Sequence, residues 1–244
     1  MFRRILIIVV LLGVTAYLAV AFTVLNSTPS GRICESVNII MNDSTGPCFI
    51  TSNEVDAILK QSRLYPLGTP IDIVQSKIIE QSLEKNIFID NAECYKTPGG
   101  SLCISVQQRR PILRVIPISG ESYYVDEQGR TMPYAAGSAA RLPVATGYIN
   151  RTMAESTLYH FSLLLRADSF WDKQVEQINV TSDGSLELVP RVGNHILFLG
   201  KAENLEAKLR RIRTFYDKAL HRIGWNKYSR ISVEFDNQVI CKRK

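Results

Sequence analysis

The chain has 244 residues, of which 45% are hydrophobic and 21% are charged, and its mean hydropathy is close to zero. This length accommodates one or two folded domains, and this composition excludes a disordered polymer. Lys and Arg number 29 against 23 Asp and Glu. Such a modest basic excess is typical of a solvated surface, with nucleic acid, anionic lipid or an acidic partner as alternatives.

Residues 5–25 form an uninterrupted run of uncharged, mostly apolar residues directly after Arg3 and Arg4. A helix needs about 20 such residues to cross the core of a bilayer, and the arginines favour a cytoplasmic N-terminus. A cleavable signal peptide is the alternative, because Ala19 and Ala21 have the spacing that a signal peptidase accepts, but the run is longer than the usual apolar part of such a peptide. The sequence predicts a single-pass type II membrane protein.

This topology divides the N-terminal part of the chain into three segments. We expect a cytoplasmic tail over residues 1–4, a transmembrane helix in the lipid bilayer over residues 5–25 and a linker over residues 26–32. Everything after the linker then lies outside the cytoplasm, where nucleic acid is not an expected partner.

The next segments follow the order β-α-α-β-β. Alternating apolar residues predict a strand over residues 36–41. One helix is expected to begin at Ser52, and a second at Thr69 with Pro70 in its first turn. Two strands over residues 88–96 and 101–108 flank a Pro-Gly-Gly turn. This order resembles a POTRA domain, a small module that extracytoplasmic membrane proteins use to bind polypeptides, and we expect it to span residues 33–110.

Five cysteines, at positions 34, 48, 94, 103 and 241, show no spacing that is typical of a zinc site. Cys94 and Cys103 flank the predicted turn symmetrically, so a hairpin there would set them opposite each other. Thiols in an oxidising compartment can pair. A disulfide between Cys94 and Cys103 and the retention of free thiols therefore both stay open.

Proline at position 111 marks the start of a second domain, expected over residues 111–244, because proline in a sheet is typical of edges and first strand positions. Strand-like residues before a Gly129 turn predict a hairpin over residues 123–133. The pattern then predicts a helix, three strands, a second helix and a last strand, at residues 151–168, 175–181, 185–189, 194–199, 204–223 and 230–240. The fold class is therefore α+β, with a mainly antiparallel sheet in this domain.

No catalytic, cofactor-binding or metal site is predicted. The three histidines lie on separate expected elements, without the spacing of a triad or a metal site. Asp126 and Glu127 are adjacent in a turn, where successive side chains diverge, so they make a poor acid–base pair. We expect a protein that is not an enzyme. Four Asn-x-Ser/Thr triplets leave a membrane-anchored glycoprotein enzyme as a minor alternative; they begin at Asn26, Asn42, Asn150 and Asn179.

Three short motifs resemble, in order and spacing, those of the FtsQ/DivIB family of bacterial division proteins. They cover residues 106–111, 123–129 and 141–147. The first departs from the family pattern, because Gln108 stands where the family usually has a glutamate. The resemblance implies a non-enzymatic scaffold of the division septum in the cell inner membrane, with periplasmic domains that bind FtsB and FtsL and help to recruit and regulate septal peptidoglycan synthases. A POTRA-bearing assembly or transport factor is the alternative, although the chain shows no internal repeat or barrel strands.

The resemblance also implies where a partner binds. In the family, the terminal strand and the helix before it receive FtsB, and these elements correspond here to residues 231–241 and 205–223. A strand with an open outer edge is suited to strand addition by a partner, whereas a strand that merely closes the sheet is the alternative. The expected partner-binding residues are Ile231, Val233, Phe235, Asn237, Val239, Ile240, Cys241, Arg213 and Tyr216.

Overall fold

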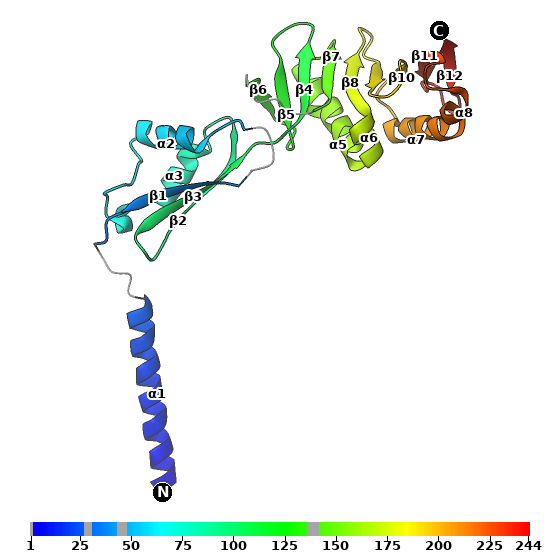
Figure 1. Ribbon diagram of the computed structural model, residues 1–244. Coiled ribbons are helices and arrows are strands. Elements are labelled where there is room, and N and C mark those ends of the chain that lie inside the picture. The colour runs from blue at the N-terminus through cyan, green and yellow to red at the C-terminus, as the bar shows by residue number, and fades with distance from the viewer. Residues whose placement is uncertain (1, 27–30, 43–47, 136–141) are drawn as a thin grey trace. The chain divides into compact units, whose positions relative to one another are not determined.

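The computed structural model describes residues 2–26, 31–42, 48–135 and 142–244 (Figure 1). The chain divides into two compact units, one of Met1–Asn42 with Ile50–Gln107 and the other of Asp43–Phe49 with Gln108–Lys244. Each unit has a buried hydrophobic core of its own.

Helix α1 covers Phe2–Asn26. Its residues 10–20 are exposed, including Tyr17 and Leu18. Within the described parts of the chain, we find no helix whose length and apolar character suffice to cross a membrane. The transmembrane helix expected over residues 5–25 therefore stays a prediction.

The first unit has the predicted order β-α-α-β-β. Its elements are β1 (Ser36–Met41), α2 (Ser52–Gln61), α3 (Ser76–Leu83), β2 (Ile89–Lys96) and β3 (Ser101–Gln108). The three strands form a sheet of order β1-β3-β2, in which β1 runs parallel to β3. The two helices bury Val55, Leu59 and Leu83 against this sheet, each with none of its surface exposed.

Helix α2 begins at Ser52, as predicted, whereas the second helix of this unit begins later than predicted. Thr51 caps α2, because the Thr51 hydroxyl accepts the Glu54 N–H while the Glu54 carboxylate accepts the Thr51 N–H at 2.7 Å. Thr69 and Pro70 open a short 3-10 turn, Ile71–Ile73, rather than α3. The reason is an antiparallel bridge between Ile33 and Pro70, which holds this part of the backbone extended.

Cys94 and Cys103 both carry free thiols, so the disulfide considered between them is not formed. Cys94 belongs to the hydrophobic core of the first unit. Cys103 lies between Leu102 and Ile104, which both belong to that core. Because successive side chains of a strand point to opposite faces, the two thiols lie on different sides of the sheet and cannot bond without movement of the backbone.

The second unit is built on a nine-stranded sheet. In the described residues its order is β12-β11-β10-β9-β8-β7-β4-β5-β6. The strands are β4 (Pro111–Pro117), β5 (Tyr123–Asp126), β6 (Thr131–Pro133), β7 (Val144–Gly147), β8 (Val175–Val180), β9 (Leu186–Pro190), β10 (Ile196–Gly200), β11 (Tyr228–Ser232) and β12 (Ile240–Arg243). Three neighbouring pairs are parallel, β4 with β7, β7 with β8 and β10 with β11. The sheet is therefore mixed, although most of its neighbouring strands are antiparallel.

Helices cover one face of this sheet (Figure 1). They are α4 (Arg151–Met153), the π-helical turn η2 (Ala154–Leu158), α5 (Tyr159–Ala167), α6 (Ser169–Gln174), α7 (Leu205–Phe215), the π-helical turn η3 (Tyr216–Leu220) and α8 (His221–Ile223). Phe161 and Ile212 of these helices and Ile178 of the sheet are buried in one common core. Residues 169–171 begin α6, where we expected only the end of a helix, because the Asp168 carboxylate caps the N–H of Phe170.

We expected a single last strand over residues 230–240, and this prediction is wrong. The chain forms two strands there, and β12 runs antiparallel to β11, with Ser232 opposite Ile240 and Ile231 opposite Cys241. Asn237 lies between them with a φ of 60°, a left-handed conformation that asparagine tolerates better than most residues. The chain thus reverses between β11 and β12, which places β11 inside the sheet and β12 at its end.

Candidate protein-interaction surface

Strand β12 lies at one end of the sheet of the second unit. It pairs with β11 on one side, and no strand of the described chain pairs with its other side. Its outward N–H and C=O groups are therefore open to an additional strand. Ile240 is 50% exposed at the start of β12, and Lys242 and Arg243 follow as exposed cations. An edge of this kind can bind an extended peptide through main-chain hydrogen bonds.

Helix α7 and the turn η3 support this edge from one face. Their apolar residues recur at the spacing of a helix, and Leu209, Ile212 and Tyr216 are almost fully buried. They share a core with Ile231 of β11 and with Val233 just after it, which both have none of their surface exposed. The edge strand thus rests on a rigid base rather than on a loop.

The segment between β11 and β12 is attached to α7 by one arginine. Arg211 donates from Nη1 to the carbonyl of Phe235, and its Nη2 lies 3.3 Å from an oxygen of the Asp236 carboxylate. At its start the segment is held to the sheet, because the Val233 N–H donates to the Phe198 carbonyl at 2.9 Å. These contacts leave the Phe235 ring 58% exposed.

A groove of about 590 Å³ runs between α7 and this segment. Its lining combines apolar side chains with three cations and consists of Ala207, Arg210, Arg211, Thr214, Phe215, Lys218, Ala219, Asn237 and Val239. Such a lining suits a partner segment that carries both apolar and acidic side chains.

The charge of the chain is concentrated around this surface. Residues 201–244 contain twelve Lys and Arg against five Asp and Glu, whereas the 200 residues before them contain 17 against 18. Lys218, Arg222, Lys242 and Arg243 are all exposed. The last fifth of the chain therefore accounts for the whole net positive charge of the protein, which favours an acidic partner.

The structure places the predicted partner-binding residues in three groups. Phe235, Asn237 and Ile240 are exposed, and Val239 and Cys241 are half-buried. Arg213 is also half-buried, since its guanidinium lies 3.6 Å over the Phe170 ring and it pairs with Asp217. The third group is buried and can support a partner only from behind; it consists of Ile231, Val233 and Tyr216.

The sequence prediction did not include the cations of the groove. Arg210, Arg211 and Lys218 contribute to the groove together with Phe215. Arg211, Phe215 and Lys218 follow one another at spacings of four and three residues, which could have indicated a common surface. Only the position of the segment before β12 turns that surface into a groove.

A buried pair of polar side chains lies behind the surface. The Tyr216 hydroxyl and Nε2 of His195 are 2.7 Å apart, and both residues are at least 97% buried. Burial lowers the pKa of the His195 ring, although the nearby Trp225 carbonyl favours the charged form. Burial also raises the pKa of Tyr216. Both groups are therefore neutral at pH 7, and they share one buried hydrogen bond.

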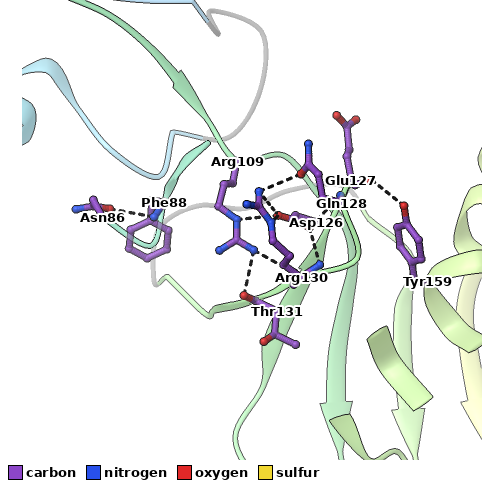
Figure 2. A network of polar contacts seen from close by, with 9 residues as sticks. All are labelled: Asn86, Phe88, Arg109, Asp126, Glu127, Gln128, Arg130, Thr131 and Tyr159. Carbon is purple, nitrogen blue, oxygen red and sulfur yellow. Dashed lines mark hydrogen bonds and ion pairs between the residues drawn. The ribbon is translucent and has the colours of Figure 1, made fainter. Parts of the chain in front are cut away.

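The opposite end of the sheet contains a buried ionic network (Figure 2). The Asp126 carboxylate has none of its surface exposed, and it accepts from Nε of Arg109 at 2.7 Å and from Nε of Arg130 at 3.0 Å. It also accepts the backbone N–H groups of Gln128 and Arg130. Arg109 donates in turn to the carbonyls of Arg130 and Thr131, each at 3.1 Å.

These contacts show what two of the three sequence motifs do. Arg109 comes from the first motif and Asp126 from the second, and together they fix the turn between β5 and β6. The carboxylate of the neighbouring Glu127 pairs instead with Arg166 at 3.2 Å. Its carbonyl accepts from the Tyr159 hydroxyl at 3.0 Å (Figure 2). The acidic residues of this turn therefore act as hydrogen-bond acceptors that build the fold. Across the described residues, no cluster of three or more His, Cys, Asp or Glu side chains could hold a metal ion.

Known families match most of the chain. The family described as FtsQ/DivIB, C-terminal related matches residues 110–242, which is more than half of the sequence. The family described as a POTRA-like domain matches residues 32–107. No curated protein matches the chain.

Proposed function

The chain belongs to the FtsQ/DivIB family and carries a POTRA-like domain, and from this premise we propose that it is a non-enzymatic scaffold of the division septum. The family match supports a role in bacterial cell division. We propose further that the protein works by binding other division proteins outside the cytoplasm, so that septal peptidoglycan synthesis is recruited and regulated at the right place.

The open edge of β12 is the observation that carries this proposal. An extended segment of a partner can pair with residues 240–243, and its acidic side chains can then meet the cations beside the edge and in the groove. Main-chain pairing supplies affinity, whereas the exposed Phe235 and Ile240 and the charges supply selectivity. FtsB and FtsL are the partners that the family resemblance implies.

Membrane anchoring is the second part of the proposal. We propose that residues 1–4 are cytoplasmic, that residues 5–25 span the inner membrane and that residues 26–32 link them to the periplasmic domains. The uncharged run behind Arg3 and Arg4 supports this topology. The POTRA-like domain then spans residues 33–110, and the C-terminal domain spans residues 111–244.

Depletion of the protein tests the proposal in cells. We expect cells that keep growing but fail to divide, and hence become filaments, because a scaffold of septal synthesis is missing. The intact chain should restore division, whereas a variant that lacks residues 237–244 should not, although it remains folded and in the membrane fraction. Normal division after depletion would contradict the proposed function, and full rescue by the shortened variant would move the binding surface away from β12.

A further inference from the structure

The first unit has an apolar patch at the point where the linker joins it. Residues 31–34 and 66–73 lie side by side there, because the Cys34 N–H donates to the Thr69 carbonyl and the Ile71 N–H donates to the Arg32 carbonyl, each at 2.8 Å. Between these two bonds Ile33 stands opposite Pro70 in an antiparallel bridge. The linker face, as we name it, consists of Arg32, Ile33, Leu67, Pro70 and Ile73.

The linker face is apolar on its outside. Cys34 and Ile71 point into the core and are 1% and 8% exposed. Because side chains alternate along extended backbone, Ile33 and Pro70 point outward on one common face. Three large apolar side chains are consequently left in solvent, with 52% exposure for Ile33, 52% for Leu67 and 63% for Ile73. Large exposed apolar side chains that gather on segments paired in this way are typical of an interaction surface.

Basic side chains flank this apolar centre. Arg32 is exposed, and its guanidinium donates to the Pro98 carbonyl rather than to a carboxylate. Arg63 is exposed too, and it lines a hollow of about 230 Å³ together with Ile73. Lys96 donates to the carbonyl of Asp72. Two exposed acidic residues also lie beside the face: Asp72, whose carboxylate accepts the Gly31 N–H, and Glu35, two residues after Ile33. An apolar centre flanked by basic side chains is the composition of an interfacial membrane-binding surface.

The length of the linker restricts where this face can lie. Helix α1 ends at Asn26 and the described part of the first unit begins at Gly31. Five residue steps span at most about 18 Å of extended chain. If residues 5–25 are held in a bilayer, the linker face is therefore always within reach of the headgroups where the chain leaves the membrane.

We propose that the linker face binds the surface of the bilayer in which the chain is anchored, and this inference rests on the anchoring proposed above. Ile33, Leu67 and Ile73 enter the boundary between headgroups and acyl chains, while Arg32 and Arg63 contact anionic headgroups. A fixed contact of this kind orients the POTRA-like unit over the membrane, which attachment through the linker alone would not do.

Photocrosslinking in the full-length protein tests this contact. The photoreactive residue p-benzoylphenylalanine replaces Leu67 or Ile73, and Ile40 serves as the matched control position. Ile40 is 46% exposed in the same unit and lies near the far end of β1. The protein is reconstituted in bilayers of phosphatidylethanolamine and phosphatidylglycerol and irradiated. Intact-protein mass spectrometry then detects the lipid adducts. We expect phospholipid adducts at positions 67 and 73 at a level at least fivefold above that at position 40.

Two further arms separate the outcomes. Replacing phosphatidylglycerol by phosphatidylcholine should lower the yield at position 73, and so should the double substitution Arg32→Gln and Arg63→Gln. Equal yields at positions 40 and 73 in protein that stays in the membrane would overturn the lipid contact and leave the anchoring intact. Crosslinks in cell membranes to a protein instead of lipid would overturn it as well. Release of every variant by carbonate washing would disprove the anchoring itself, and the lipid contact with it.

Discussion

The two ends of the nine-stranded sheet are both exposed strands, and the chain treats them in opposite ways. At one end β6 has three residues and finishes at Pro133, which has no N–H to donate. Beside it the buried Asp126 accepts from two arginines and two backbone N–H groups. At the other end β12 begins with the half-exposed Ile240 and continues with two exposed cations.

The two ends differ in how they prevent unwanted pairing of an open sheet edge with other chains. An open edge pairs readily with other chains, so proteins usually shorten it, interrupt it with proline or place charges on it. The β6 end uses the first two devices and adds a rigid turn. The β12 end keeps its hydrogen-bonding groups available and relies on lysine and arginine, which repel another copy of the same basic edge but attract an acidic segment. A sheet that is closed at one end and selective at the other suits a scaffold with a single docking edge.

The largest effect is expected when the closed end is broken. Asp126→Asn keeps the shape of the side chain but removes the negative charge, so the 94% buried Arg109 loses its counter-charge. Breaking a buried ion pair in this way costs about 3–5 kcal/mol of the free energy of unfolding. Urea unfolding followed by tryptophan fluorescence measures this, because the two tryptophans of the chain, Trp171 and Trp225, both belong to the second unit.

The neighbouring carboxylate supplies the control for this measurement. Glu127 pairs with Arg166, and the two side chains are 35% and 42% exposed. Glu127→Gln should cost less than about 1 kcal/mol, as exposed ion pairs do. Equal losses for the two variants would show that the Asp126 network is no more important to the fold than a surface contact.

The next effect concerns the open end. Ile240→Asp places a negative charge on the edge strand, and we expect it to weaken the proposed binding of an FtsB segment by about 2 kcal/mol, or roughly 30-fold, if Ile240 is a hot spot. Calorimetric titration with that segment measures the change. Ile116→Asp is the control, because Ile116 is 38% exposed on β4, inside the sheet. Unchanged affinity of the Ile240→Asp variant would remove β12 from the binding surface.

Local sequence patterns predicted the individual helices and strands well, but they did not predict which strands pair with each other. The 3.6-residue period of Leu205, Leu209 and Ile212 indicated α7, and the structure confirms the helix. The parallel pairing of β7 with β4 and β8 joins segments that are far apart in the sequence, and no local pattern encodes it. The Asp-Asn step at residues 236–237 was a turn signal within a strand-like pattern, and missing it merged β11 with β12.

That one missed turn also explains the errors at the candidate surface. Ile231 and Val233 alternate with polar residues, as in a strand with one open face, and we therefore expected them at a partner interface. Both are fully buried, because β11 lies between two other strands and over α7. Ile240 was predicted for the wrong reason, as part of one long strand, yet the structure leaves it exposed at the edge.

Acid should lower the stability of the second unit, because a buried histidine lies behind the β12 end of its sheet. The pKa of His195 is lowered by burial beside the Tyr216 hydroxyl and near Lys244, so the unfolded chain takes up a proton at a higher pH than the folded chain. The contribution of His195 to stability is therefore complete above about pH 6.5, the ordinary pKa of histidine, and is lost as the pH falls below it. We expect the free energy of unfolding of the second unit to decrease over this range.

The slope of stability against pH identifies the residue. His195→Gln should flatten the decrease below pH 6.5, whatever its own effect on stability at neutral pH. His160→Gln should leave the slope unchanged, since His160 is exposed on α5. Unfolding curves at several pH values, followed by tryptophan fluorescence, measure both slopes. Parallel slopes for the parent protein and the His195→Gln variant would rule out this source of acid sensitivity.

The smallest effect is expected from the arginine that attaches the segment before β12. Arg211→Gln removes contacts to the Phe235 carbonyl and to Asp236, whose side chain is 77% exposed, so it should cost only about 0.5 kcal/mol of global stability. Its local effect should be larger, because this side chain holds residues 234–239 against α7. Hydrogen exchange of those amides should accelerate in the variant, while exchange in β8 stays slow. Arg210→Gln is the control, since Arg210 pairs with Glu206 within the same helix. If both variants leave exchange over residues 234–239 unchanged, the segment is held by Val233 and Val239 in the core, and the contrast between a buried ionic turn at one end and a surface-attached segment at the other becomes one of burial alone.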